Sequence, residues 1–157
     1  MYNFSSSLRC PTECKLSHSD AAWRCIVKLH IITDASGQHC DVKNLTFGPP
    51  ITDKADVEDR IRRAQRAILN PSIDPSKFLV GDQISEDPEL SFSKNSVSLE
   101  ISGKDVADLS FVDLPGLIAS VGSTGKDRDI QLVKDLVSSY IKKPSCVILL
   151  TVACESR

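Results

Sequence analysis

The pattern of hydrophobic and polar positions predicts strands alternating with helices. Residues 25–32 are rich in β-branched side chains and carry Lys28 and His30 on one face, which predicts a strand with one wetter face. Residues 92–101 predict another strand, because the apolar residues at 97, 99 and 101 alternate with polar residues at 98 and 100. Residues 33–50 contain Asp, Asn, Gly and Pro at short intervals, so we expect mostly loop there.

Two apolar runs in the second half of the chain lack a helical period. Residues 109–113 and residues 146–153 each predict a strand that is buried inside an α/β sheet. A turn at residues 103–105 separates residues 92–101 from residues 109–113, so these two strands should form a hairpin. The sheet should then be mixed, because a hairpin is antiparallel and strands joined through a helix are parallel.

A first helix should open at Thr52 and Asp53 and stop at Asn70-Pro71. Its apolar face follows a period of 3.6 residues through Val57, Ile61, Ala64 and Ile68. Four arginines fall on its other side: Arg60, Arg62, Arg63 and Arg66. We interpret them as a solvated face paired with Asp56, Glu58 and Asp59 rather than as an anion site.

A second helix should begin near Asp127 or Asp129 and end at Lys142-Lys143-Pro144, with apolar positions from Ile130 to Ile141. Together with the two flanking apolar runs it predicts a strand–helix–strand unit with a right-handed crossover. Residues 71–90 form a long connector with three prolines, a length typical of functional or mobile loops. Residues 1–8 show no periodicity, and we expect a frayed, disordered start.

The composition is that of one soluble globular domain. The 157 residues are 41% hydrophobic and 25% charged, and the net charge of -2 gives no reason to expect nucleic acid as a partner. No apolar run reaches the roughly 18 residues of a spanning helix, and the first residues lack the pattern of a signal peptide. We therefore expect a cytoplasmic location.

Six cysteines in a chain of this kind should be free thiols. One grouping, Cys10-x3-Cys14-x3-His18 with Cys25 further on, has the residue types of a zinc site. Zinc sites usually have tighter pairs such as C-x2-C, and no second pair follows here. We favour a loop that enters a strand over a zinc site.

The stretch with the clearest chemistry is Asp113-Leu114-Pro115-Gly116, at the end of the predicted strand 109–113. Open α/β sheets bind ligands at the carboxyl ends of strands. There a carboxylate can hold a water molecule on Mg²⁺, and a glycine N–H can reach a phosphate oxygen. The alternative is a plain turn in which Asp113 only caps the strand, since so short a pattern also occurs by chance.

Residues 122–126 resemble the end of a phosphate-binding P-loop but fail its pattern G-x-x-x-x-G-K-[ST]. Ser120 stands in place of the first glycine, and Asp127 stands where a hydroxyl is required. No other stretch matches a P-loop, and no Asn/Thr-Lys-x-Asp segment for guanine recognition is present. We interpret residues 122–126 as part of a flexible, switch-like loop.

The chain resembles the GTPase domain of the dynamin superfamily, close to its dynamin and Mx-like branch. The resemblance begins at Leu8 and rests on four stretches: residues 9–13, residues 51–53 with the following helix, residues 108–118 and residues 140–153. It implies an α/β fold of the P-loop NTPase type, with a mixed, mainly parallel sheet, flanking helices and a partial GTPase domain over residues 9–157. It also implies GTP and Mg²⁺ as ligands, dimerisation of GTPase domains, and work at membranes or organelles.

The resemblance assigns residues 113–116 to the site of GTP and Mg²⁺. Asp113 would contact Mg²⁺ through a water molecule, Gly116 would contact the γ-phosphate, and residues 117–127 would form switch II. Where the family has a Mg²⁺-binding threonine, this sequence has Leu8, which lacks a side-chain oxygen.

The resemblance also implies that the family's first strand, P-loop and first helix precede residue 1 and that its guanine-recognition segment follows Arg157. We expect a chain truncated at both ends, with contacts to membrane or cytoskeleton only through regions that it lacks. Because the P-loop supplies most phosphate contacts, GTP binding should be weak or absent and hydrolysis negligible. Unpaired strand edges should make the chain poorly soluble or dependent on a partner.

Two classes of function follow from these expectations. In the first, the chain belongs to a GTP-hydrolysing, membrane-remodelling enzyme. In the second, it is a non-catalytic pseudo-GTPase module that binds full-length relatives.

Overall fold

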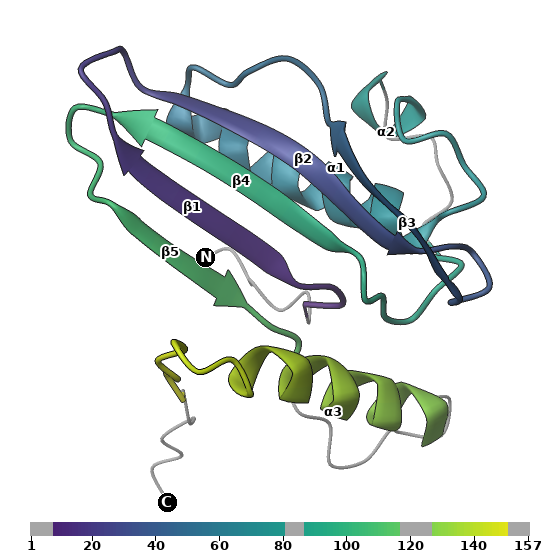
Figure 1. Ribbon diagram of the computed structural model, residues 1–157. Helices are drawn as coiled ribbons and strands as arrows, with labels where there is room; N and C mark the ends of the chain where they lie inside the picture. Colours follow the sequence, from purple (N-terminus) through teal and green to yellow (C-terminus); the bar gives the residue numbers. More distant parts are fainter. Residues whose placement is uncertain (1–7, 81–86, 117–126, 151–157) are drawn as a thin grey trace, which may run out of the picture. The chain divides into compact units, whose positions relative to one another are not determined.

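The computed structural model describes residues 8–80, 87–116 and 127–150. The chain divides into two compact units, residues 1–116 and residues 117–157, and each is described by itself. The first unit contains a five-stranded sheet and the helices next to it (Figure 1). Its strands are β1 (Thr12–His18), β2 (Arg24–Thr33), β3 (His39–Thr46), β4 (Ser96–Gly103) and β5 (Leu109–Asp113).

The sheet has the order β3-β2-β4-β1-β5 and is mixed, as predicted. The α/β class with flanking helices is also confirmed. We expected mainly parallel strands, but only the pair β1–β4 is parallel. The other three described strand pairs are antiparallel.

The predicted hairpin between residues 92–101 and 109–113 is wrong, because β1 lies between β4 and β5. The reason lies in the connection between the two strands. Asp108 Oδ1 accepts a hydrogen bond from the backbone N–H of His18 at 2.9 Å, which ties the connection to the end of β1. The chain therefore passes the end of β1 before β5 pairs with the far edge of that strand.

Residues 109–113 form a strand, as predicted, but the prediction that this strand is buried inside the sheet is wrong. The strand ends at Asp113 as expected, but it is an edge strand, and Leu109 and Phe111 are 56% and 50% exposed. In the first unit α1 packs against β2 and β4 and leaves β5 uncovered. An apolar sequence made the strand recognisable without fixing its position in the sheet.

Residues 33–50, expected as loop, contain the edge strand β3. Nearly all its side chains are exposed, so no hydrophobic alternation marks it in the sequence. It is held by antiparallel backbone pairing with β2 after a turn in which Asp34 Oδ1 accepts hydrogen bonds from the N–H groups of Ser36 and Gln38. The positive φ of 80° at Gly37 suits this turn.

The first helix is confirmed. A short turn η1 (Lys54–Asp56) is capped by the Asp53 carboxylate, which accepts a hydrogen bond from the N–H of Ala55, and α1 (Val57–Leu69) follows. The buried face of α1 packs on the core side of the sheet, and Asn70 ends the helix. The core combines residues from this helix and three strands, among them Cys14, Val27, Leu29, Ala64, Ile68 and Leu99.

The arginine face of α1 is only partly the solvated face that we predicted. Asp59 pairs with Arg62 and Arg63, as expected. Arg60 instead donates to the backbone carbonyls of Phe47 and Pro49, at 3.0 and 3.1 Å, and so fixes the loop before the helix. The connector after α1 contains a four-residue helix, α2 (Lys77–Val80), which buries Phe78.

The second unit contains α3 (Asp127–Ile141), which confirms the second predicted helix. The predicted strand 146–153 is wrong where it can be compared: residues 146–150 form no strand, and Val147 and Leu149 are 87% and 90% exposed. In the described part of this unit no strand is present to pair with them, so an apolar run alone does not make a strand. Residues 151–153 lie outside the described residues.

No helix in the described parts of the chain is long and apolar enough to cross a membrane.

Candidate functional site

The candidate site lies where β5 ends and β1 begins. Asp113, the last residue of β5, is the antiparallel partner of Thr12, the first residue of β1. This register brings residues 113–116 to the same end of the sheet as residues 9–11, about 100 positions away in the sequence. Two of the stretches that carry the family resemblance therefore meet at one edge.

Backbone hydrogen bonds hold residues 9–11 in place. The carbonyl of Arg9 accepts a hydrogen bond from the N–H of Ser93, and the carbonyl of Pro11 accepts one from the N–H of Val97, both at 3.0 Å. Pro11 itself is fully buried. Residues 9–11 are therefore held in a defined position beside the end of β5.

Within residues 113–116, the two outer positions are exposed and the two inner positions anchor the turn. Pro115 is fully buried and fixes the turn, and Leu114 is half-buried. Asp113 and Gly116 are exposed, and a Cβ atom placed on Gly116 would meet no atom within 4 Å. A ligand can therefore approach both the Asp113 carboxylate and the Gly116 backbone, as phosphate binding by an Asp-x-x-Gly turn requires.

The donor set at this site suits an indirect contact with Mg²⁺. Mg²⁺ prefers oxygen ligands and usually keeps several water molecules while it binds substrate phosphates. No group of three or more His, Cys, Asp or Glu residues able to hold a metal occurs among the described residues. A single exposed carboxylate fits contact through a metal-bound water. Leu8, which is half-buried, offers no side-chain oxygen.

The alternative zinc grouping is not assembled. Cys10 and Cys14 are buried free thiols, and His18 is exposed at the other end of β1. Because a strand rises about 3.3 Å per residue, Cys14 and His18 lie roughly 13 Å apart along β1. Burial also raises the pKa of Cys10 to about 12, which disfavours the thiolate that zinc binds. Cys25, also buried and free, has a pKa raised to about 11, chiefly by burial.

Some predicted parts of the site cannot be compared. The loop from 117 to 126, which includes the P-loop-like residues 122–126, lies outside the described residues.

Asn95, which the sequence interpretation missed, joins the end of β2 to the start of β4 at the same end of the sheet. No local sequence signal marks it, because its partners are about 60 residues away.

Comparison with known proteins decides the family. A sequence profile of the Dynamin family matches residues 12–157, which is nearly the whole chain. The chain belongs to the dynamin family. Within this family, it is 34% identical over 135 residues to the interferon-induced GTP-binding protein Mx of Dicentrarchus labrax. It is 33% identical over 148 residues to the Mx protein of Perca fluviatilis.

These alignments cover most of this dynamin-family chain but only part of its relatives. They include 84% of the chain and 18% of the D. labrax protein, and 94% of the chain and 39% of the P. fluviatilis protein. The interpretation of the chain as part of a dynamin-type GTPase domain is confirmed by the profile match and these relatives.

Proposed function

We propose that residues 9–157 form part of a GTP-binding and GTP-hydrolysing domain, and that residues 113–116 face the γ-phosphate and Mg²⁺. The observation that carries the proposal is the Thr12–Asp113 pair, which sets the exposed Asp113 and Gly116 beside residues 9–11. The Mx relatives are named as GTP-binding proteins, which supports GTP as the ligand.

Three residues of the turn have distinct parts in this proposal. The Asp113 carboxylate accepts a hydrogen bond from a water molecule on Mg²⁺, and the Gly116 N–H donates to a phosphate oxygen. The buried Pro115 holds the turn between them. Bound Mg²⁺ would neutralise negative charge on the phosphates while the γ-phosphoryl group is transferred to water.

The 157 residues by themselves should bind GTP weakly and hydrolyse it negligibly. Their sequence contains no G-x-x-x-x-G-K-[ST] stretch and no guanine-reading Asn/Thr-Lys-x-Asp segment, and Leu8 has no hydroxyl for Mg²⁺. In proteins that have a P-loop, its backbone and lysine supply most contacts to the phosphates. Strong binding therefore requires groups beyond these residues.

For the whole protein we propose assembly with other dynamin-like chains, a cytoplasmic location that includes the periphery of membranes or organelles, and remodelling of those membranes. These proposals rest on family membership. We further propose that contacts with membrane or cytoskeleton are made by parts of the whole protein other than these residues.

One observation favours a second function, that of a non-catalytic module that binds full-length relatives. The edge strand β5 exposes Leu109, Phe111 and Val112, a surface suited to pairing with another chain. Co-sedimentation with a full-length relative that does not depend on nucleotide would favour this function. Co-sedimentation only with GTP would favour the first function.

A titration of the purified chain with a fluorescent GTP analogue and Mg²⁺ tests the GTP-binding proposal. We expect weak, saturable binding that depends on Mg²⁺ and falls roughly tenfold in Asp113→Ala, the usual scale for losing a hydrogen bond to a charged group. Asp41→Ala, which removes an exposed carboxylate from β3, is the matched control and should bind like wild type. Equal binding by Asp113→Ala and wild type would overturn the assignment of the site.

A further inference from the structure

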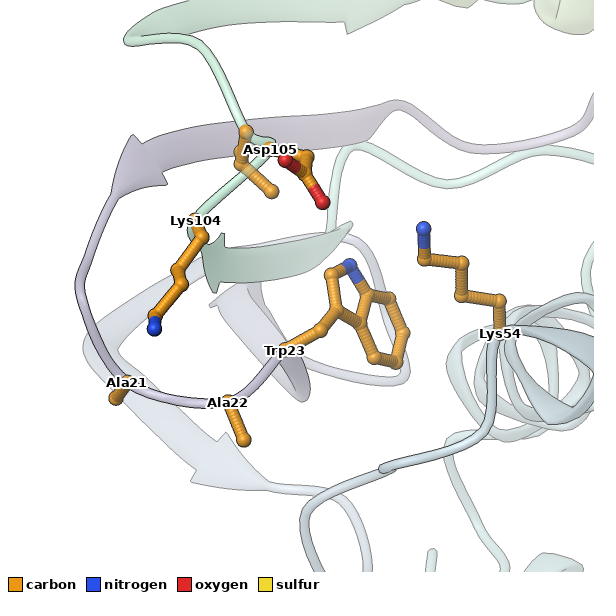
Figure 2. A pocket seen from close by; sticks show the side chains of 7 residues that line it. Ala21, Ala22, Trp23, Lys54, Lys104 and Asp105 are labelled. Carbon is orange, nitrogen blue, oxygen red and sulfur yellow. The ribbon is translucent and has the colours of Figure 1, made fainter.

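A small pocket lies at the end of the sheet opposite to residues 113–116 (Figure 2). At that end β4 finishes at Gly103, the parallel partner of His18 at the end of β1. The six steps from Thr12 to His18 put this end roughly 20 Å from Asp113 at about 3.3 Å per residue. The pocket is therefore separate from the proposed GTP site.

The pocket is built around the tryptophan ring of Trp23. Its other walls are the charged side chains of Lys54, Lys104 and Asp105, together with three small apolar residues. Its volume is about 200 Å³, less than the roughly 300–1,000 Å³ typical of small-molecule sites and suited to one side chain.

The position of the ring is fixed by its neighbours. A Cβ atom on Gly103 would lie 3.1 Å from Trp23 Cα and 3.2 Å from its Cδ1, so glycine lets Trp23 pack directly against the end of β4. Lys54 Nζ lies 5.7 Å from the ring centroid, within the range of a cation–π contact. The half-buried ring also packs against the core. The apolar wall of the pocket is thus preformed.

In the described part of the chain, the polar groups around the ring are available to a ligand. Among the described residues, no hydrogen bond or ion pair occupies the Lys54 ammonium, the Lys104 ammonium, the Asp105 carboxylate or the Trp23 indole N–H. Lys54 and Asp105 both extend toward the indole ring, while the Lys104 side chain extends away from it (Figure 2). Two cations and one carboxylate give the pocket a net charge of about +1 at neutral pH.

We propose that this pocket binds one glutamate side chain of a partner polypeptide. The carboxylate would accept hydrogen bonds from the Lys54 ammonium and the indole N–H, with Lys104 adding attraction. The methylene groups of the glutamate side chain would pack against the apolar face of the ring. Asp105 would repel any anion, and it would repel a phosphate dianion more strongly than the single negative charge of a glutamate carboxylate.

Trp23 makes the proposal directly testable, because it is the only tryptophan in the chain. The probe is the peptide Ac-Gly-Ala-Glu-Ala-Gly-NH₂, compared with the same peptide carrying glutamine. Binding is followed by tryptophan fluorescence and by the indole N–H resonance in the full 157-residue chain. We expect a saturable response to the glutamate peptide and at least tenfold weaker binding of the glutamine peptide.

Substitutions separate the pocket from general charge effects. Lys54→Gln should weaken binding of the glutamate peptide at least about fivefold, the change expected for about 1 kcal/mol. Lys43→Gln, which changes another exposed lysine, on β3, is the matched control and should leave binding unchanged. Asp113→Ala should also have no effect, so failure here is distinguishable from failure of the GTP site.

Three results would overturn the proposal. The first is no saturable response to the glutamate peptide, and the second is equal binding of the glutamate and glutamine peptides or of Lys54→Gln and wild type. The third is tighter binding of inorganic phosphate than of the glutamate peptide, which would assign the pocket to a phosphate-bearing ligand.

Discussion

At the scale of single residues, Asn95 has the most demanding environment near the candidate site. Its buried Oδ1 accepts hydrogen bonds from the N–H groups of Ile32 and Thr33 at 2.8 and 2.9 Å, and its Nδ2 donates to the carbonyl of Thr33 at 3.1 Å. The Thr33 hydroxyl also donates to Oδ1. From its place just before β4, Asn95 thus forms hydrogen bonds with the backbone groups at the end of β2.

Asn95→Ala should lower the free energy of unfolding by about 2–3 kcal/mol, because it leaves buried donors without acceptors. Asn44→Ala is the matched control, since the Asn44 Oδ1 contact with His30 Nδ1 is exposed and its loss should cost less than about 1 kcal/mol. Urea denaturation of the three proteins measures both changes. Similar losses in the two variants would contradict the role given to Asn95.

Cys10 should make the protein sensitive to alkali. Burial raises its pKa from 9.0 to about 12, so the folded state disfavours loss of the thiol proton. A group with a raised pKa in the folded state contributes stability below the unfolded value that is lost as pH rises toward the folded value. The stability of the wild type should therefore fall from about pH 9 towards pH 12, by up to about 1.4 kcal/mol per pH unit.

Denaturation midpoints between pH 7 and pH 11 test this effect. Cys10→Ala should show a shallower alkaline decline than wild type, even though the smaller side chain lowers stability at neutral pH. Cys40→Ala, at a partly exposed position on β3, should keep the wild-type slope. The effect of Cys10 would be refuted by identical slopes in Cys10→Ala and wild type.

At the scale of secondary structure elements, the two edge strands of the sheet differ. β3 carries Asp41 and Lys43, charged residues of the kind that discourage pairing with other chains. β5 has no charge before its last residue, and its exposed side chains include Leu109 and Phe111. Uncontrolled association of the chain should therefore start at β5.

Phe111→Lys should reduce self-association and leave the fold intact, because Phe111 is 50% exposed. Val42→Lys is the control, since Val42 is 61% exposed but lies on the charged edge strand β3. Sedimentation velocity should show less oligomer in Phe111→Lys and an unchanged distribution in Val42→Lys. An equal effect of both substitutions would point to general charge rather than to β5.

The same elements show how far sequence patterns determine the fold. The helix α1 was predictable because its apolar period and its cap at Asp53 are local features. The edge strand β3 was not, because backbone pairing with β2 rather than side-chain burial holds it. The position of β5 depends on the bond from His18 to Asp108, which spans 90 residues and leaves no local pattern.

The candidate site was predictable in part for the same reason. The end of β5 at Asp113 followed from an apolar run and a Pro-Gly break, both of which are local. The contribution of Asn95 and the pocket at Trp23 depend on packing between distant segments. Burial of Cys10 and Cys14 likewise became clear only from the sheet.

At the scale of the whole molecule, family membership and the geometry of the candidate site point to the same end of the sheet. The Dynamin family match covers residues 12–157, and the register of β1 and β5 brings residues 9–12 together with residues 113–116. The central claim is that this end of the sheet meets the phosphates of GTP. The claim concerns the place of contact, so it holds even when affinity is weak.

The most direct test is a residue-resolved NMR titration of the ¹⁵N-labelled chain with GTP and Mg²⁺ at millimolar concentrations, where binding of about 4 kcal/mol is measurable. We expect amide shift changes concentrated at residues 9–12 and 113–116, dependent on Mg²⁺ and strongly reduced in Asp113→Ala. No change at these residues, or changes concentrated elsewhere in the sheet, would contradict it.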